Sequence, residues 1–124
     1  YQYFYNENDA VERIEYYNDS TISKISDYRN GLLISEVFPQ RKYRKEFTYV
    51  YDEKNRMIKK DDDDFFYYIY KYNDFGIEQI ERIYKKKEMS VGLETFEYND
   101  KGLLIVRKVF VKGKLINEYH YTYK

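Results

Sequence analysis

The sequence contains no cysteine and no tryptophan, and it has a single proline among its 124 residues. Without cysteine the chain has no means of forming disulfides or thiolate metal sites. A cysteine-free composition agrees with a reducing cytosol and equally with many bacterial envelope proteins, so the compartment stays open. No apolar run approaches the roughly 18 residues of a membrane-spanning helix, so we expect no membrane span.

The sequence also lacks an excess of charge of either sign. The 22 lysine and arginine residues balance the 22 aspartate and glutamate residues, and the formal net charge is zero. Proteins that bind nucleic acid usually carry a basic patch or stripe, so we expect no nucleic-acid partner. The chain begins at Tyr1 rather than at a methionine, and we therefore expect any leader to have been removed or to lie outside this sequence.

Aromatic residues are what the sequence has in abundance. Eighteen tyrosines and eight phenylalanines make up 21% of the chain. Aromatic and branched side chains favour β-strands because they pack well on a pleated, half-buried surface. A chain of 124 residues is the length of one domain, so we expect a single β domain over residues 1–124.

A short sequence motif recurs along the chain. The segment "EYNDKG" at 97–102 has counterparts in "FYNEND" at 4–9, "VYDEKN" at 50–55 and "KYNDFG" at 71–76, and a shortened copy, "DYRNG", lies at 27–31. The tyrosine of this motif is termed the anchor tyrosine. The anchor tyrosines recur with a period of about 23 residues, which predicts a tandem repeat; they are Tyr5, Tyr28, Tyr51, Tyr72, Tyr98 and Tyr121.

A second aromatic residue stands two positions before most anchors. Residues two apart in a strand point to the same face, so each couplet places two rings side by side. Only the shortened copy departs, with Ser26 in that position. The other copies carry Tyr3, Tyr49, Tyr70, Phe96 and Tyr119.

Two kinds of polar stretch predict chain reversals. After each anchor comes a residue type that tolerates a positive φ in a tight turn; we single out Gly31, Asn55, Gly76 and Gly102. Second polar stretches follow at 18–20, 39–42, 61–64, 85–92 and 112–114. Two strands per repeat predict an all-β antiparallel meander of about five tandem β-hairpin repeats, curled into an open sheet with essentially no helix.

The repeated motif resembles the tyrosine-aspartate (YD) repeats, also called Rhs repeats, of bacterial surface and toxin-delivery proteins. "YVYDEKNRMI" at 49–58 and "FEYNDKGLL" at 96–104 are similar to the YD unit Y-x-Y-D-x-x-G-x-L, whereas the copy at 70–78 departs at Glu78. The resemblance implies hairpins stacked side by side in a curling antiparallel sheet, and it carries over no catalytic residue or cofactor. Choline-binding hairpin repeats are a less similar alternative, since they depend on tryptophan and are rich in glycine.

Three other features have ordinary structural explanations. The acidic run at 61–64 lacks the interleaved glycine and carbonyl ligands of a calcium loop, so we expect a solvated hairpin tip rather than a metal site. The basic run at 85–87 is expected to be an exposed loop that protects a sheet edge. His120 has no cysteine or glycine-flanked serine nucleophile beside it, and no pair of carboxylates stands out as a hydrolase pair.

The sequence therefore predicts a non-catalytic binding or scaffolding module without a cofactor, belonging to a bacterial envelope-associated or exported protein. A cytosolic protein that neutralises a toxin is the alternative from another class, and a glycan-binding repeat module is a third, because rings stack on sugars. The aromatic ladder itself is expected to hold the sheet together. We also expect edge-to-edge self-association, since the first strand, with Tyr1, Tyr3 and Tyr5, carries no charged side chain and no proline.

Overall fold

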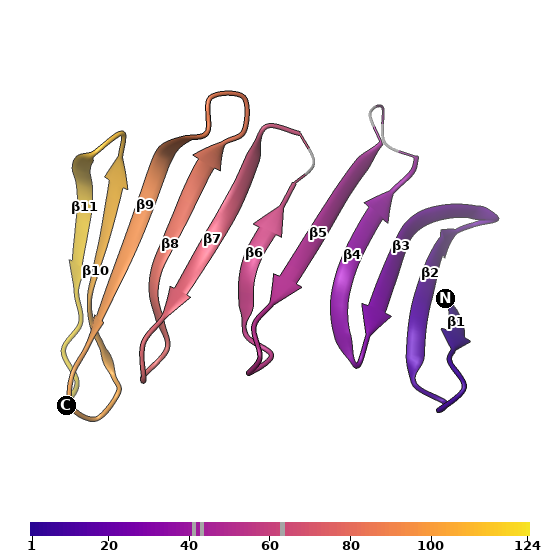
Figure 1. Cartoon of the computed structure of the whole chain (residues 1–124), viewed down its shortest axis with the longest axis horizontal. Coiled ribbons are helices and arrows are strands. Elements are labelled where there is room, and N and C mark those ends of the chain that lie inside the picture. Colours follow the sequence, from indigo (N-terminus) through magenta and orange to yellow (C-terminus); the bar gives the residue numbers. More distant parts are fainter. Residues whose placement is uncertain (41, 43, 63) are drawn as a thin grey trace. The chain divides into compact units, whose positions relative to one another are not determined.

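The computed structural model describes residues 1–40, 42, 44–62 and 64–124, and these form β-strands and turns without a helix (Figure 1). Two positions of the predicted polar stretches, Arg41 and Asp63, lie outside the described residues. The strands are β1 (Gln2–Tyr5), β2 (Val11–Asn18), β3 (Thr21–Arg29), β4 (Leu32–Phe38), β5 (Lys45–Tyr51), β6 (Met57–Asp61), β7 (Phe66–Tyr72), β8 (Ile77–Tyr84), β9 (Met89–Tyr98), β10 (Leu104–Val111) and β11 (Lys114–His120).

The strand order in the sheet is the order of the strands in the chain, and neighbouring strands are antiparallel. Among the described residues β1 does not pair with β11, so the sheet is not closed. The predicted fold class, an open all-β antiparallel meander without helix, is confirmed. The number of repeats and their period remain predictions. None of the described residues belongs to a helix long and apolar enough to cross a membrane.

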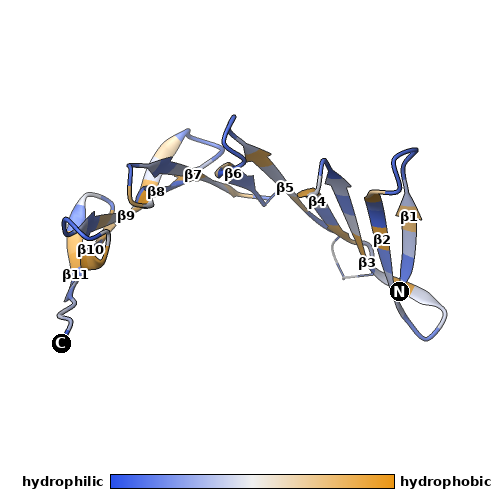
Figure 2. Ribbon diagram, turned by 90° about the horizontal axis from the view of Figure 1, so that it is seen from below, coloured by the Kyte–Doolittle hydropathy of each residue, from blue (hydrophilic) through white to orange (hydrophobic). Residues whose placement is uncertain are grey.

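The chain divides into two units, Tyr1–Asp64 with β1 to β6 and Phe65–Lys124 with β7 to β11. Within each unit a strand contacts only its neighbours in the sheet, so the described part of each unit is a single layer. Apolar and polar residues are interleaved along the strands, while most of the turns are polar (Figure 2). No apolar side chain of the described residues is fully buried. Stability must therefore come from cross-strand neighbours on each face.

The strand registers define two faces in each unit. In unit 1, Ile14, Ser26, Glu36 and Phe47 are successive cross-strand partners from β2 to β5. We call their side the aromatic face of unit 1, because Tyr16, Tyr28, Tyr49 and Tyr51 lie two or four residues from them on the same strands. The opposite side, the polar face, carries the row Arg13, Asp27, Ser35 and Thr48.

The aromatic face of unit 2 follows from the same analysis. Tyr70 pairs with Ile80, which pairs with Glu94 on β9, and Phe96 pairs with Arg107, which pairs with Tyr119 on β11. Tyr68, Tyr72 and Tyr98 lie on the same face because they are two residues from these positions on their strands. Each unit thus gathers its repeat aromatics on one face.

A side-chain oxygen organises the turn that follows the anchor tyrosine in four hairpins. Asp52 Oδ1 accepts hydrogen bonds from the backbone N–H groups of Lys54 and Arg56, both at 2.9 Å. Asn6, Asn73 and Asn99 each accept two backbone N–H bonds in the same way. Asparagine and aspartate are favoured in turns because their side chains can accept such bonds.

The predicted turn residues lie in these reversals with positive φ. Gly31, Asn55 and Gly102 have φ of 79°, 62° and 78°, in the left-handed region, and Gly76 has φ of 157°. Asp9 and Asn30 are left-handed as well. Glycine and asparagine populate this region at little cost, which explains their use in these turns.

One predicted turn was wrong in extent. The reversal expected over residues 85–92 ends at Glu88, and Met89 to Gly92 belong to β9. The alternation from Met89 onward allows these residues to pair with β8, where Arg82 is the partner of Gly92 and Tyr84 that of Met89. Backbone hydrogen bonds to β8 therefore extend β9 through a segment that the sequence predicted to be part of a polar turn.

Each anchor tyrosine of the five hairpins stands beside a β-bulge. The register shifts directly before the pairs of Tyr5 with Val11, Tyr28 with Leu33, Tyr51 with Met57, and Tyr72 with Ile77, and it also shifts next to the pair of Tyr98 with Leu104. A bulge inserts one extra residue into a strand and disrupts the ladder locally. The carbonyl groups beside a bulge therefore need other donors.

Tyrosine hydroxyls supply such donors from the following strand. Tyr51 Oη donates to the carbonyl oxygen of Leu33 at 2.8 Å, and Tyr98 Oη donates to that of Ile77 at 2.6 Å. A third bond, at 2.7 Å, runs from Tyr123, which is not an anchor, to Leu104. In all three the acceptor residue directly precedes the extra residue of a bulge. The hydroxyl thus gives these positions a role that phenylalanine lacks.

Removing the hydroxyl should therefore destabilise the fold. We expect Tyr51→Phe and Tyr98→Phe each to lower the free energy of unfolding by about 1–2 kcal/mol, because a half-buried carbonyl loses its donor. Urea titration monitored by circular dichroism measures the change. Tyr17→Phe is the matched control, since the Tyr17 hydroxyl is exposed and binds Glu15 at the surface; it should be close to neutral. Wild-type stability in both test variants would contradict the assigned role.

The same variants have a pH signature. Burial raises the pKa of the Tyr51 and Tyr98 hydroxyls above the ordinary tyrosine value. The folded chain therefore keeps these protons while the unfolded chain releases them, and stability falls as the pH rises above about 10. The phenylalanine variants lack this loss, so the stability gap between wild type and variant should narrow above pH 10. A gap that stays constant with pH would contradict the burial of these hydroxyls.

Candidate functional site

The predicted repeat aromatics lie in strands or directly beside them, and within each unit they share the aromatic face. They are Tyr5, Tyr28, Tyr49 and Tyr51 in unit 1, and Tyr70, Tyr72, Phe96, Tyr98, Tyr119 and Tyr121 in unit 2. No second layer of described residues covers this face in either unit. The aromatic face is therefore the candidate functional surface of the chain.

Ser26 marks the best-packed point of the aromatic face in unit 1. It is 1% exposed, and it is the only fully buried residue of the part of the chain that the structure describes. Its cross-strand partners are Ile14 and Glu36, and the Tyr28 hydroxyl contacts it. Burial raises the pKa of Tyr28, and the neighbouring Tyr16 and Glu36 raise it further. The position that lacks the repeat aromatic is thus filled by the surrounding side chains.

A carboxylate lies at the centre of this cluster. Glu36 Oε1 accepts a hydrogen bond from the Tyr49 hydroxyl at 2.7 Å, and its Oε2 lies 3.6 Å from Lys24 Nζ. The Lys24 ammonium lies 4.1 Å from the centre of the Tyr16 ring, which is a favourable cation–π distance. The network links β2 to β5 through one charged group with two donors. This network therefore connects neighbouring strands through their side chains.

Unit 2 has a comparable arrangement on its own aromatic face. Glu94 Oε2 lies 3.2 Å from Arg107 Nε, and this hydrogen bond is the main reason why the pKa of Arg107 is raised. Arg107 in turn lies 5.2 Å from the Tyr119 ring centre. Burial raises the pKa of Tyr70, with smaller effects from Tyr68, Tyr72 and Glu94. The carboxylate of this face is again neutralised by a cation on the next strand.

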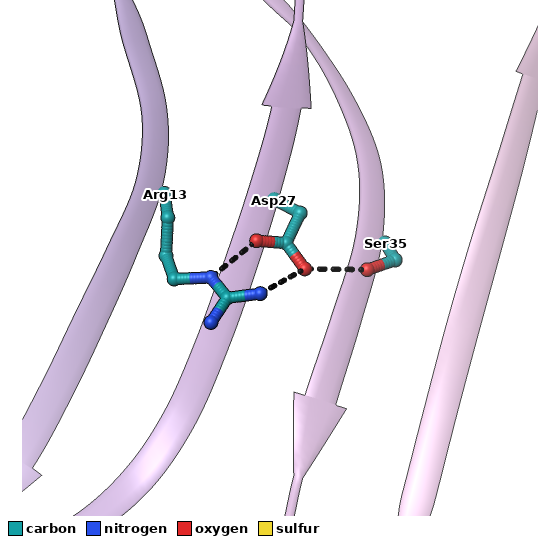
Figure 3. A network of polar contacts seen from close by, with 3 residues as sticks. All are labelled: Arg13, Asp27 and Ser35. Atoms are coloured by element: carbon teal, nitrogen blue, oxygen red, sulfur yellow. Dashed lines mark hydrogen bonds and ion pairs between the residues drawn. The ribbon is translucent and has the colours of Figure 1, made fainter. Parts of the chain in front are cut away.

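The polar face of unit 1 carries its own network (Figure 3). Arg13 binds both carboxylate oxygens of Asp27, with Nε–Oδ1 at 2.7 Å and Nη2–Oδ2 at 3.4 Å, and the Ser35 hydroxyl donates to Oδ2 at 3.3 Å. The hydrogen bond to Asp27 raises the pKa of Arg13. The three residues are direct cross-strand partners on β2, β3 and β4. Both oxygens of Asp27 are engaged, so it is poorly placed to act as a general base.

A hollow of about 520 Å³ adjoins this network on the polar face. Phe4, Arg13, Asp27, Arg29 and the hairpin residue Asn6 are among its lining residues. Its walls mix charged and apolar side chains, and Arg13, one of its two arginines, is already bound to Asp27. The hollow offers hydrogen-bonding groups for a polar surface, whereas a site for nucleophilic chemistry would require an activated nucleophile beside a base.

The other residues that drew interest in the sequence are exposed or half-buried. His120 Nε2 lies 3.1 Å from Glu118 Oε1 on the exposed strand β11. Asp61 ends β6, and Lys86 and Lys87 are exposed in the turn between β8 and β9. Among the described histidine, aspartate and glutamate residues, no group of three or more is arranged to hold a metal ion.

Sequence reasoning missed the charged members of these networks. Glu36, Glu94 and Arg13 belong to no repeated motif, and Asp27 stands at a position of the motif that differs from copy to copy. Their partners are 8 to 14 residues away along the chain. They meet because the register of the strands places them opposite one another. Each bulge shifts that register by one residue, and bulge positions have no clear signal in a single sequence.

Polar groups and rings of the aromatic face differ in how far the sheet itself engages them. Most of the polar groups on the aromatic face are held by cross-strand partners, while the rings present flat, amphipathic surfaces without a covering layer. Tyrosine rings of this kind are enriched where proteins bind other proteins. No protein-family model matches the chain, and no curated protein sequence matches it.

The packing around Ser26 can be tested with a substitution that restores the repeat pattern. We expect Ser26→Tyr to destabilise the fold by about 1–3 kcal/mol, because a buried site with filled surroundings has no room for a ring. Thermal and urea unfolding measure the effect. Ser90→Tyr is the control, since Ser90 is an exposed residue of β9 and should tolerate the ring. A Ser26→Tyr variant at least as stable as wild type would show that the site is not filled.

Proposed function

We propose that the chain is a non-catalytic protein-binding or scaffolding module built of YD-like repeats, within a bacterial envelope-associated or exported protein. The observation that carries the proposal is the uncovered aromatic face of each unit. Its rings are half-buried by their neighbours on one layer only, and several, such as Tyr3, Tyr5 and Tyr119, are exposed. Exposed aromatic surface of this extent on soluble proteins marks interaction sites.

The chemistry of the face supports a protein partner. Tyrosine offers a large rigid contact area together with a hydroxyl that can donate or accept, and both features suit protein interfaces. The charged groups Glu36 and Glu94 are already neutralised by Lys24 and Arg107, so covering them does not bury an unpaired charge. The repeated sequence motif, which resembles that of YD repeats, supports the assignment to a bacterial envelope-associated or exported protein.

Binding through the aromatic face predicts which substitutions weaken it. Affinity purification from envelope and cytosolic fractions of the source organism, followed by calorimetry with each recovered protein, identifies partners and their compartment. Tyr5→Thr and Tyr119→Thr should weaken binding about tenfold or more, as expected for aromatic anchors. Phe4→Thr and Leu115→Thr are matched controls, because these exposed residues lie on the opposite face of the same strands. Equal effects on both faces, or recovery of glycans alone, would contradict the proposal.

The same module associates edge to edge with a second copy. The strand β1 has no charged side chain and no proline, and its four residues are all exposed. Such an edge presents unpaired backbone groups that another strand can bind. Light scattering at micromolar concentration should give a dimer for wild type and a monomer for Tyr3→Lys, because an edge lysine blocks strand pairing. A strictly monomeric wild type would refute edge pairing while leaving the binding function untouched.

A further inference from the structure

Gly92 differs from the other four glycines of the chain. Gly31, Gly102 and Gly113 are left-handed, with φ of 79°, 78° and 81°. A Cβ at Gly76 would lie 3.0 Å from the Tyr98 hydroxyl oxygen, so that position is crowded. Gly92, in contrast, lies within β9 without a positive φ, and a Cβ there would meet no atom closer than 3.6 Å. Neither backbone conformation nor crowding requires glycine at this position.

A glycine that the fold does not require leaves a gap in the aromatic face of unit 2. A hollow of about 220 Å³ lies over Gly92. Its walls include Ile80, Val109 and Val111, and Tyr68 and Arg82 also line it. Tyr68, Arg82, Gly92 and Val111 are successive cross-strand partners from β7 to β10, so the hollow is centred on one row of the face. Glycine within a strand often marks a bulge, as the register shift at the neighbouring Val91 shows here, or a close approach by a ligand or another backbone.

Arg82 gives the hollow a cation without an acidic partner. Its guanidinium carbon lies 3.7 Å from the centre of the Phe66 ring, and among the described residues no carboxylate lies within ion-pair distance of it. Stacking on a ring leaves the in-plane N–H donors of arginine free for another acceptor. The nearby Glu94 is paired with Arg107 at 3.2 Å, so among the described residues that line the hollow Arg82 is the charged group without an ion-pair partner.

We infer that the hollow over Gly92 is an anchor point for a partner polypeptide, which inserts an aliphatic side chain over the glycine and binds Arg82 through an adjacent carboxylate. The apolar walls suit an aliphatic group, and the planar fork of arginine matches a carboxylate bidentately. Arginine is also among the residues that most often dominate binding at interfaces. This inference rests on the proposed protein-binding function and assigns it a place and a ligand chemistry.

The test uses ¹⁵N-labelled full chain and two acetylated, amidated peptides, Ser-Leu-Glu-Ser and Ser-Leu-Gln-Ser. The glutamate peptide should shift the backbone amide of Gly92 and the side-chain Nε–H of Arg82 saturably. The glutamine peptide should bind about tenfold more weakly, since it lacks the charge-assisted hydrogen bonds. Arg82→Gln should remove the difference between the two peptides. Equal binding of both peptides to wild type, or no saturable shift at Gly92 with either peptide, would overturn the inference.

Gly92→Val separates a binding role from a structural one. Valine suits a strand, and its Cβ would meet only ordinary contact distances here, so the melting temperature of the variant should not fall below that of wild type while peptide binding is lost. Thr95→Val, on the opposite face of β9, is the control and should bind normally. A Gly92→Val variant that melts lower than wild type, or that binds the peptide as wild type does, would overturn the inference. If Gly92→Val still binds the partners recovered from cell fractions, the assigned site fails while the proposed function stands.

Discussion

The hydrogen bond from a tyrosine hydroxyl to the carbonyl beside a bulge is the interaction on which the rest of the sheet depends. A single-layer sheet has no core in which to bury side chains, and every bulge leaves backbone groups without a ladder partner. Tyr51 and Tyr98 address both difficulties, because the ring covers the neighbouring strand while the hydroxyl binds Leu33 or Ile77 across the sheet. The two contributions are local, so the hairpin that carries Leu33 and the hairpin that carries Ile77 are each stabilised by the next hairpin along the chain, as in other repeat proteins.

This constraint also explains the charged residues on a face made mainly of rings. A carboxylate half-buried among aromatics needs donors, and Glu36 and Glu94 find them in Tyr49 with Lys24 and in Arg107. Such pairs contribute modestly to stability because solvent reaches them from the open side. Their greater effect is on register, since a slip by one residue would move each carboxylate to the opposite face and away from its donors.

The fold class was predictable from the sequence because its signals are local. Alternating tyrosines predicted strands, and asparagine or aspartate followed by glycine predicted turns. The structure has strands and turns at these positions. The end of the turn after β8 was not predictable, since Met89 to Gly92 become a strand only through pairing with β8. The burial of Ser26 and the pairs of Arg13 with Asp27 and of Arg107 with Glu94 were missed for the same reason: they depend on cross-strand register, which the bulges set.

Many of the aromatic and charged side chains that could contact another molecule already hold this sheet together. The sheet therefore has few places at which to bind another molecule. Rings and charges that are engaged across strands, such as Tyr49, Glu36 and Arg107, contribute shape to a partner but few free donors. Specific binding must therefore concentrate where a group on the aromatic face lacks a partner within the sheet. Among the described residues the N–H donors of Arg82 meet this condition, because stacking on Phe66 orients the guanidinium without engaging them, and the absent side chain of Gly92 gives access to it.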